Sequence, residues 1–105
     1  MEKPRYCVYI MTNQSHSTLY AGITSNLPRR IWEHKTRQKK GFTQRYRTRK
    51  LVFYQCYEEV TNAIKFEKQL KRWQRPWKER LIHEMNPHWQ DLYDDRMHMF
   101  NEHNE

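Results

Sequence analysis

Two short apolar runs joined by a polar segment are the feature that most constrains how this chain folds. The runs are Tyr6–Met11 (YCVYIM) and Leu19–Ile23 (LYAGI), and residues 12–18 (TNQSHST) lie between them. Both runs have the length and the aromatic or β-branched content of strands, and the segment between them is rich in turn-forming residues. The pattern therefore predicts a β-hairpin at the start of the fold.

The register of this hairpin decides where its two central tyrosines lie. A hairpin that is symmetric about residues 14 and 15 places Tyr9 opposite Tyr20, with both phenols on one face of the sheet. A slip of one residue would send the two side chains to opposite faces. The shared face is therefore a hypothesis about register.

The rest of the sequence predicts one more strand and three helices. Residues 24–26 (TSN) and Thr61 offer N-caps for two of the helices, and residues 86–87 (NP) stop the last one. The predicted elements after the hairpin are a helix from Leu27 to about Lys39, a basic loop at residues 42–49, a strand at Leu51–Tyr57, and helices from about Asn62 to Trp73 and from Pro76 to about Met85. This order, β-β-α-β-α-α, predicts an α+β fold with a small antiparallel three-stranded sheet flanked by helices. The first and third strands are apolar on both sides, so helices should cover both faces.

A chain of 105 residues predicts a single domain. We place it at residues 1–93, with Trp89, Leu92 and Tyr93 packing back on the body, and expect residues 94–105 to form an acidic, mobile tail.

The two cysteines, Cys7 and Cys56, both lie in strand-like apolar runs. That position favours two free thiols in the core over a disulfide or a pair of metal ligands. The sequence shows no signal peptide and no apolar run near membrane-spanning length. We therefore expect a cytoplasmic, reducing setting and no membrane contact.

The charge is distributed unevenly along the chain. Residues 1–83 carry 19 Lys and Arg against 6 Asp and Glu, whereas residues 84–105 carry 1 against 6. A dense basic stretch beside aromatic residues is typical of nucleic-acid binding, although a solvated surface is the alternative. The predicted nucleic-acid contacts are Lys39, Lys40, Arg45, Tyr46, Arg47, Arg49 and Lys50.

Two predicted helices each carry one charge in their apolar stripe. The stripes are Leu27, Arg30, Ile31 and His34 in the first, and Ala63, Phe66, Glu67 and Leu70 in the second. A charge that points inward is costly unless it is paired or coordinated. Arg30 and Glu67 therefore indicate either a buried ion pair or a polar cleft beside the core.

The tyrosines and these charges together resemble the GIY-YIG nuclease family. The triplets are Cys7-Val8-Tyr9 and Tyr20-Ala21-Gly22; Arg30 follows Tyr20 by ten residues, His34 comes one helical turn later, and Glu67 lies in Ala63–Lys71 (AIKFEKQLK). The segment 86–92 (NPHWQDL) resembles small single-domain bacterial members, which are similar to the N-terminal nuclease part of the excinuclease. The resemblance covers residues 5 to 93, and the ordered set is far more specific than either triplet.

The resemblance implies a catalytic set of Tyr9, Tyr20, Arg30, His34 and Glu67. Tyr9 would act as the general base, which needs its pKa lowered from about 10 by nearby cations. Glu67 would hold one divalent ion, Mg²⁺ or alternatively Mn²⁺. Cys7 and Ala21 replace the family's Gly and Ile, which we interpret as packing changes, and Glu79 stands where some members have an asparagine.

The sequence thus predicts a metal-dependent endonuclease that hydrolyses DNA phosphodiester bonds with low intrinsic sequence specificity. Branched or damaged DNA in repair is a candidate substrate, and a protein partner is a candidate source of specificity. A non-catalytic nucleic-acid-binding module is the first alternative. The second is a structural protein whose Arg30–Glu67 ion pair holds the core.

Overall fold

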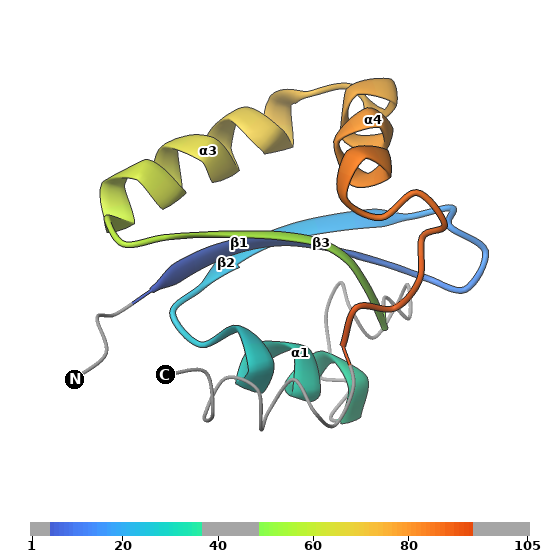
Figure 1. Ribbon diagram of the computed structural model, residues 1–105, viewed down its shortest axis with the longest axis horizontal. Coiled ribbons are helices and arrows are strands. Elements are labelled where there is room, and N and C mark those ends of the chain that lie inside the picture. The colour runs from blue at the N-terminus through green and yellow to red at the C-terminus, as the bar shows by residue number, and fades with distance from the viewer. Residues whose placement is uncertain (1–4, 37–48, 94–105) are drawn as a thin grey trace.

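The computed structural model describes residues 5–36 and 49–93, which form a three-stranded sheet with helices on both faces (Figure 1). The elements are β1 (Tyr6–Thr12), β2 (Leu19–Thr24), α1 (Leu27–Thr36), β3 (Lys50–Tyr57), α3 (Val60–Arg72) and α4 (Arg75–Met85). The strands are antiparallel and lie in the order β2-β1-β3. The predicted α+β class and element order are confirmed.

The sheet separates two layers of helices. In Figure 1, α1 lies below the sheet, whereas α3 and α4 lie above it. The central strand β1 supplies both layers because successive side chains of a strand point to opposite faces. Cys7, Tyr9 and Met11 pack in the layer of α1, and Val8 and Ile10 pack in the layer of α3 and α4. Both faces are therefore covered, as the sequence predicts.

The helix ends follow local hydrogen bonds. Asn26 caps α1, because its side-chain oxygen accepts the Arg29 N–H at 3.2 Å. The predicted cap at Thr61 is wrong, because the Glu59 carbonyl already accepts the N–H groups of Asn62 and Ala63, and α3 begins at Val60. Asn86 ends α4 as predicted. None of these helices is both long and apolar enough to cross a membrane.

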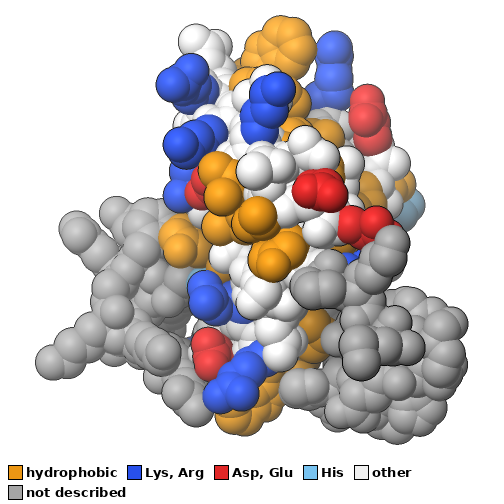
Figure 2. Space-filling model, turned by 90° about the vertical axis from the view of Figure 1, so that its left-hand side faces the viewer, with side chains coloured by type: hydrophobic (Ala, Val, Ile, Leu, Met, Phe, Trp, Pro, Cys, Tyr) orange, Lys and Arg blue, Asp and Glu red, His pale blue; other side chains and the backbone are white. Residues whose placement is uncertain are grey.

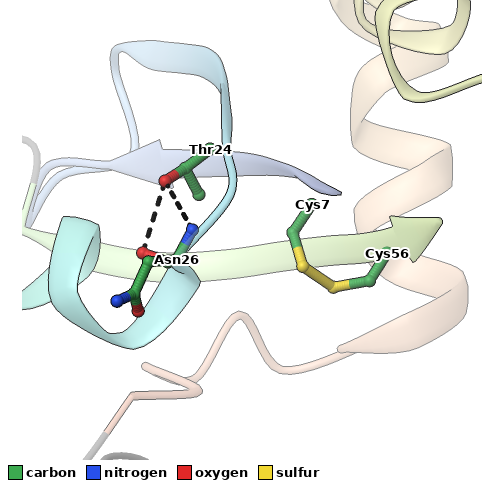
Figure 3. Close-up of a disulfide and its surroundings, with 4 residues drawn as sticks. All are labelled: Cys7, Thr24, Asn26 and Cys56. Carbon is green, nitrogen blue, oxygen red and sulfur yellow. Dashed lines mark hydrogen bonds between the residues drawn. A yellow bond between two sulfur atoms is a disulfide. The ribbon is translucent and has the colours of Figure 1, made fainter. Parts of the chain in front are cut away.

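The two cysteines form a disulfide, so the prediction of free core thiols is wrong. Cys7 and Cys56 are directly paired residues of the β1–β3 ladder, with their Cα atoms 3.9 Å apart. Figure 3 shows the sulfur atoms bridging the two strands, close to the turn at Thr24 and Asn26 that leads into α1. The burial of the two cysteines does not show which residues of the two strands are paired, so the sequence did not predict this register. The disulfide also removes the thiol argument for a reducing compartment.

The segment after α4 returns to the layer of α1. It crosses the edge of the sheet beside β3 (Figure 1), where Leu92 donates its N–H to the Leu51 carbonyl at 2.8 Å. Asp91 accepts the Leu51 N–H at 3.1 Å and forms an ion pair with Lys35 of α1. Tyr93 is buried in the same layer. The predicted packing of this segment on the body is confirmed, whereas residues 94–105 lie outside the described residues.

Candidate active site

Tyr9, Tyr20 and His34 form one aromatic cluster between the sheet and α1. The Tyr9 hydroxyl lies 3.2 Å from His34 Nε2, which is hydrogen-bonding distance. The Tyr20 ring lies 6.4 Å from the Tyr9 ring and 5.5 Å from the His34 ring, centroid to centroid. Tyr9 is fully buried, and Tyr20 and His34 are partly exposed. The cluster therefore runs from the core to the surface.

The shared face of the two tyrosines is confirmed, but the predicted pairing is wrong. Tyr9 lies opposite Gly22, and Tyr20 lies opposite Met11. The hairpin is centred one residue later than predicted, because Asn13 caps the turn through the N–H groups of Ser17 and Thr18. The resulting shift in partners is two residues, and an even shift keeps each side chain on its face.

Gly22 makes room for the buried phenol. A Cβ atom at this position would lie 2.5 Å from the Tyr9 hydroxyl oxygen and 2.6 Å from the adjoining ring carbon. Contacts that close force a neighbour to move. The second triplet thus has a steric function that the sequence did not reveal, although a glycine inside a strand is a known sign of close approach.

Arg30 lies beside this cluster, but its position differs from the prediction. Its side chain is 45% exposed, so it is not an inward charge in the apolar stripe of α1. The guanidinium interacts with the Tyr9 phenol and lies 3.6 Å from a carboxylate oxygen of Glu33. Glu33 also accepts from Arg29 at 3.3 Å. Arg30 is therefore a solvent-facing cation at the exposed side of the cluster.

The protonation states of the cluster are set mainly by burial. Burial raises the pKa of Tyr9 to about 12; Tyr20 adds to the rise and Arg30 opposes it. Burial also lowers the pKa of His34 to about 4, with Arg30 as a second cause and Glu33 opposing. At neutral pH the phenol is therefore protonated and the imidazole is neutral, so His34 Nε2 can accept the phenolic hydrogen. The lowered pKa that a Tyr9 base needs is not present in this state.

Glu67 lies in the other layer of the fold. It is on α3, its side chain is 13% exposed, and its carboxylate pairs with Lys71 at 2.7 Å. Among the described residues, the carboxylate that acts on Tyr9 and His34 is Glu33. The predicted Arg30–Glu67 ion pair is wrong, since each residue has another partner and their helices lie on opposite faces of the sheet. The structure brings together four of the five predicted catalytic residues.

The donor set for a metal is small. Within residues 5–36 and 49–93 no group of three or more His, Cys, Asp and Glu side chains could hold a metal ion. A single carboxylate still fits Mg²⁺, which keeps several waters and binds through one or two carboxylates plus substrate phosphate. Glu67 fits that description if the ion displaces Lys71.

The predicted nucleic-acid contacts fall mostly outside the described residues. This applies to Lys39, Lys40, Arg45, Tyr46 and Arg47. Arg49 is exposed. Lys50 donates to His16 Nε2 at 2.8 Å, and the His16 ring packs on Trp89 at 4.8 Å. Lys50 thus joins β3 to the tip of the hairpin.

Two further residues near the cluster were missed by the sequence reasoning. Glu33 holds both arginines at the start of α1, and Asp91 anchors Lys35 on the same helix. The i, i+3 and i, i+4 spacing of Glu33 from Arg30 and Arg29 is a signal that was available. Asp91 and Lys35 are 56 residues apart in the sequence, so no local pattern predicts their contact.

The fold and the cluster define a small α+β domain of nuclease type. The chain belongs to the GIY-YIG family, since the model of the GIY-YIG catalytic domain matches residues 5–80. It is 30% identical over 82 residues to a UPF0213 protein of Pectobacterium carotovorum, covering 78% of this chain and 82% of that relative. It is 29% identical over 85 residues to a UPF0213 protein of Bacillus pumilus, covering 81% of this chain and 86% of that relative.

A solved structure shares the fold. The solution NMR structure of a UPF0213 protein from Bacillus halodurans matches with a TM-score of 0.52 and 23% sequence identity. The match covers 83% of this chain and 92% of the other. At this identity the likeness concerns the fold, and the nuclease-type function follows from the family match.

Proposed function

We propose that this protein is a metal-dependent endonuclease that hydrolyses DNA phosphodiester bonds. The observation that carries the proposal is the cluster of Tyr9, Tyr20 and His34, with Arg30 at its exposed side, in a chain of the GIY-YIG family. Phosphodiester hydrolysis needs neutralisation of the phosphate oxygens, an oriented water and an acceptor for its proton. The cluster offers groups for each need.

Arg30 binds the scissile phosphate in this proposal. Its guanidinium is exposed, always charged and able to form two parallel hydrogen bonds to phosphate oxygens. Glu33 lies 3.6 Å from Arg30 Nε, and the guanidinium also acts on the Tyr9 phenol. Tyr20, at the edge of the cluster, donates a hydrogen bond to the phosphate or to the attacking water.

Tyr9 and His34 handle the proton. The neutral imidazole accepts a hydrogen bond from the Tyr9 hydroxyl, and for Tyr9 to take a proton from the attacking water its own proton must first move to His34 Nε2. The neutral ring that accepts at Nε2 carries its hydrogen on Nδ1, which is buried and has no hydrogen-bond partner among the described residues. Because burial raises the pKa of Tyr9 to about 12, the base role requires substrate-bound surroundings more positive than Arg30 alone.

Glu67 is the residue proposed to hold the divalent ion, Mg²⁺ or Mn²⁺. The bound ion would neutralise charge that develops on the phosphate and the leaving group. Glu67 lies in the layer of α3, so the proposal requires substrate to reach both layers around the sheet edge.

A nicking assay on supercoiled plasmid tests the proposal. The wild type is incubated with Mg²⁺, with Mn²⁺ and with EDTA, beside Arg30→Ala and Glu67→Gln. We expect metal-dependent nicking that falls at least 100-fold in both variants, in line with the loss of one transition-state contact, roughly 10² to 10³ in rate.

Matched controls make the test specific. Arg29→Ala removes the same charge one residue earlier from a side chain that is 66% exposed, and Glu84→Gln removes an exposed acid from α4. Both should nick at close to the wild-type rate. If wild type and variants are equally inactive with either metal, hydrolysis is rejected. Salt-sensitive DNA binding without nicking would then favour the non-catalytic nucleic-acid-binding module. The raised pKa of Tyr9 also favours that module, because it keeps the phenol protonated.

Low sequence specificity, a role in repair and a cytoplasmic location complete the proposal. They rest on the sequence predictions and the family match. Incubation with matched linear, branched and nicked duplexes of the same sequence checks the substrate preference.

A further inference from the structure

The helices α3 and α4 carry a basic surface on the side of the sheet away from the tyrosine cluster. Together they hold seven Lys and Arg against three Glu. Glu67 pairs with Lys71, and Glu79 pairs with Arg75. The other five cations have no acidic partner among residues 5–36 and 49–93: Lys65, Lys68, Arg72, Lys78 and Arg80.

Three of these cations form a row along α3. Lys65, Lys68 and Arg72 have the spacing i, i+3, i+7, so they share one face of the helix, and all three are exposed. The row is about 10 Å long at the rise of an α-helix. Figure 1 places α3 and α4 above the sheet, and the upper part of the molecule in Figure 2 shows several Lys and Arg side chains with hydrophobic and a few acidic side chains among them.

An exposed indole stands where the two helices meet. Trp77 of α4 is 58% exposed, more than any other large hydrophobic residue in the described part of the chain. Its ring lies 6.1 Å from that of Trp73, which in turn packs edge-on against Phe66 at 6.2 Å. Trp77 is thus a solvent-facing ring that lies against Trp73, which packs in turn on Phe66.

We infer that α3 and α4 form a binding surface for single-stranded nucleic acid, separate from the tyrosine cluster. The row of Lys65, Lys68 and Arg72 contacts successive phosphates, and an unpaired base stacks on Trp77. A positively charged track beside an aromatic platform is the arrangement by which proteins hold single strands without reading sequence. A duplex keeps its bases stacked on each other, so it would use the cations but not the indole.

The same residues fit an anionic membrane less well. A helix that lies on a bilayer exposes its apolar face, whereas the apolar face of α3 is turned to the sheet, with Ala63 and Leu70 fully buried. Besides Trp77, the large apolar side chains exposed on the two helices are only 39–41% accessible. A single protruding ring among cations suits a base.

Fluorescence anisotropy with a labelled 20-nucleotide oligo(dT) tests the inference. It is measured in EDTA, so that hydrolysis plays no part, at several salt concentrations. The triple variant K65Q/K68Q/R72Q should lower the slope of log affinity against log salt by about 2, because single strands release about 0.7 counterion per phosphate contact. Trp77→Ala should weaken binding roughly 5- to 100-fold, the range for loss of one stacked base.

Two control variants and a test with lipid vesicles complete the design. Ile64→Ala removes an exposed apolar side chain from α3, and Arg5→Gln removes an exposed cation elsewhere; both should bind oligo(dT) as the wild type does. The inference is overturned if the triple variant and Trp77→Ala, with unchanged circular dichroism, bind oligo(dT) like the wild type. It is also overturned if Trp77-dependent binding appears with phosphatidylserine vesicles and not with oligo(dT). Binding in EDTA without any nicking in Mg²⁺ would reject the proposed hydrolysis and leave this surface standing.

Discussion

The two faces of the sheet are built from neighbouring residues of one strand but differ in kind. The face toward α3 and α4 packs aliphatic side chains such as Val8 and Ile10, with an aromatic edge of Phe66 and Trp73. The face toward α1 packs Tyr9 together with the disulfide and also holds His34; burial shifts the pKa values of Tyr9 and His34. One face can therefore carry stability while the other carries polar chemistry. The difference teaches that a small domain can hold a buried phenol and imidazole because the opposite layer is apolar.

The largest expected effect is a cavity in the apolar face. Leu70 of α3 is fully buried, so Leu70→Ala should lower the free energy of unfolding by about 2 to 5 kcal/mol. Ile64→Ala on the exposed side of the same helix should change it by less than about 0.5 kcal/mol. Urea unfolding followed by circular dichroism measures both. Equal effects at the two positions would show that this face does not carry the stability.

Removing the disulfide should have the next largest effect. Cys7 and Cys56 are 49 residues apart in sequence, so the bridge restricts a long loop of the unfolded chain. The double variant C7A/C56A should lose about 2 to 4 kcal/mol. The oxidised wild type, the same protein in a reducing agent and the variant are compared by urea unfolding. If reduction leaves the wild type unchanged, the bridge does not stabilise the α1 face.

Gly22→Ala tests the site face by overfilling it. The new Cβ would meet the Tyr9 hydroxyl oxygen at 2.5 Å, so the ring must move away from its hydrogen bond with His34. The expected cost is about 1 to 3 kcal/mol of stability. Ala21→Gly, one residue earlier on the other face of β2, serves as the control for backbone effects. A crystal structure of Gly22→Ala with Tyr9 unmoved would contradict the steric role of this glycine.

Local patterns predicted the elements of this fold well. Apolar runs next to turn residues predicted the strands, and helical spacing predicted the helices, because these signals lie within a few residues. Asn26 and Asn86 marked two helix ends. The face shared by Tyr9 and Tyr20 was also predictable, because any even shift of register preserves it.

The sequence did not predict the contacts between segments that are far apart in the chain. The pairing of Cys7 with Cys56 depends on the β1–β3 register, and the burial of either residue is compatible with a free thiol. The inward position predicted for Arg30 failed because a long side chain on a helix edge can reach solvent. For Glu67, helical spacing predicted a side chain turned inward, and that side chain is only 13% exposed, but the spacing did not show which face of the sheet α3 would cover.

The smallest expected effect is the pH dependence that His34 gives to the site face. The pKa of His34 is lowered from 6.5 to about 4, so between these values the unfolded chain binds a proton that the native imidazole does not. Stability should therefore fall as the pH drops from 6.5 toward 4, by about 1 to 2 kcal/mol for a partly exposed group. Arg30 adds to the lowered pKa and Glu33 opposes it, while Tyr9, whose pKa burial raises to about 12, stays uncharged in this range.

The variant His34→Gln separates this effect from general acid sensitivity. The amide keeps a hydrogen-bond acceptor for Tyr9 but has no titration, so the loss of stability between pH 7 and pH 5 should become smaller than in the wild type. Burial, Lys50 and Arg75 lower the pKa of His16 in the same direction, so His16→Gln should also reduce the slope. His83→Gln, which removes an exposed histidine from α4, is the matched control. Urea midpoints at pH 7, 6 and 5 measure the slopes. An unchanged slope in His34→Gln would mean that the native imidazole binds protons as the unfolded one does, so that burial does not keep it neutral as the acceptor for Tyr9 below pH 6.5.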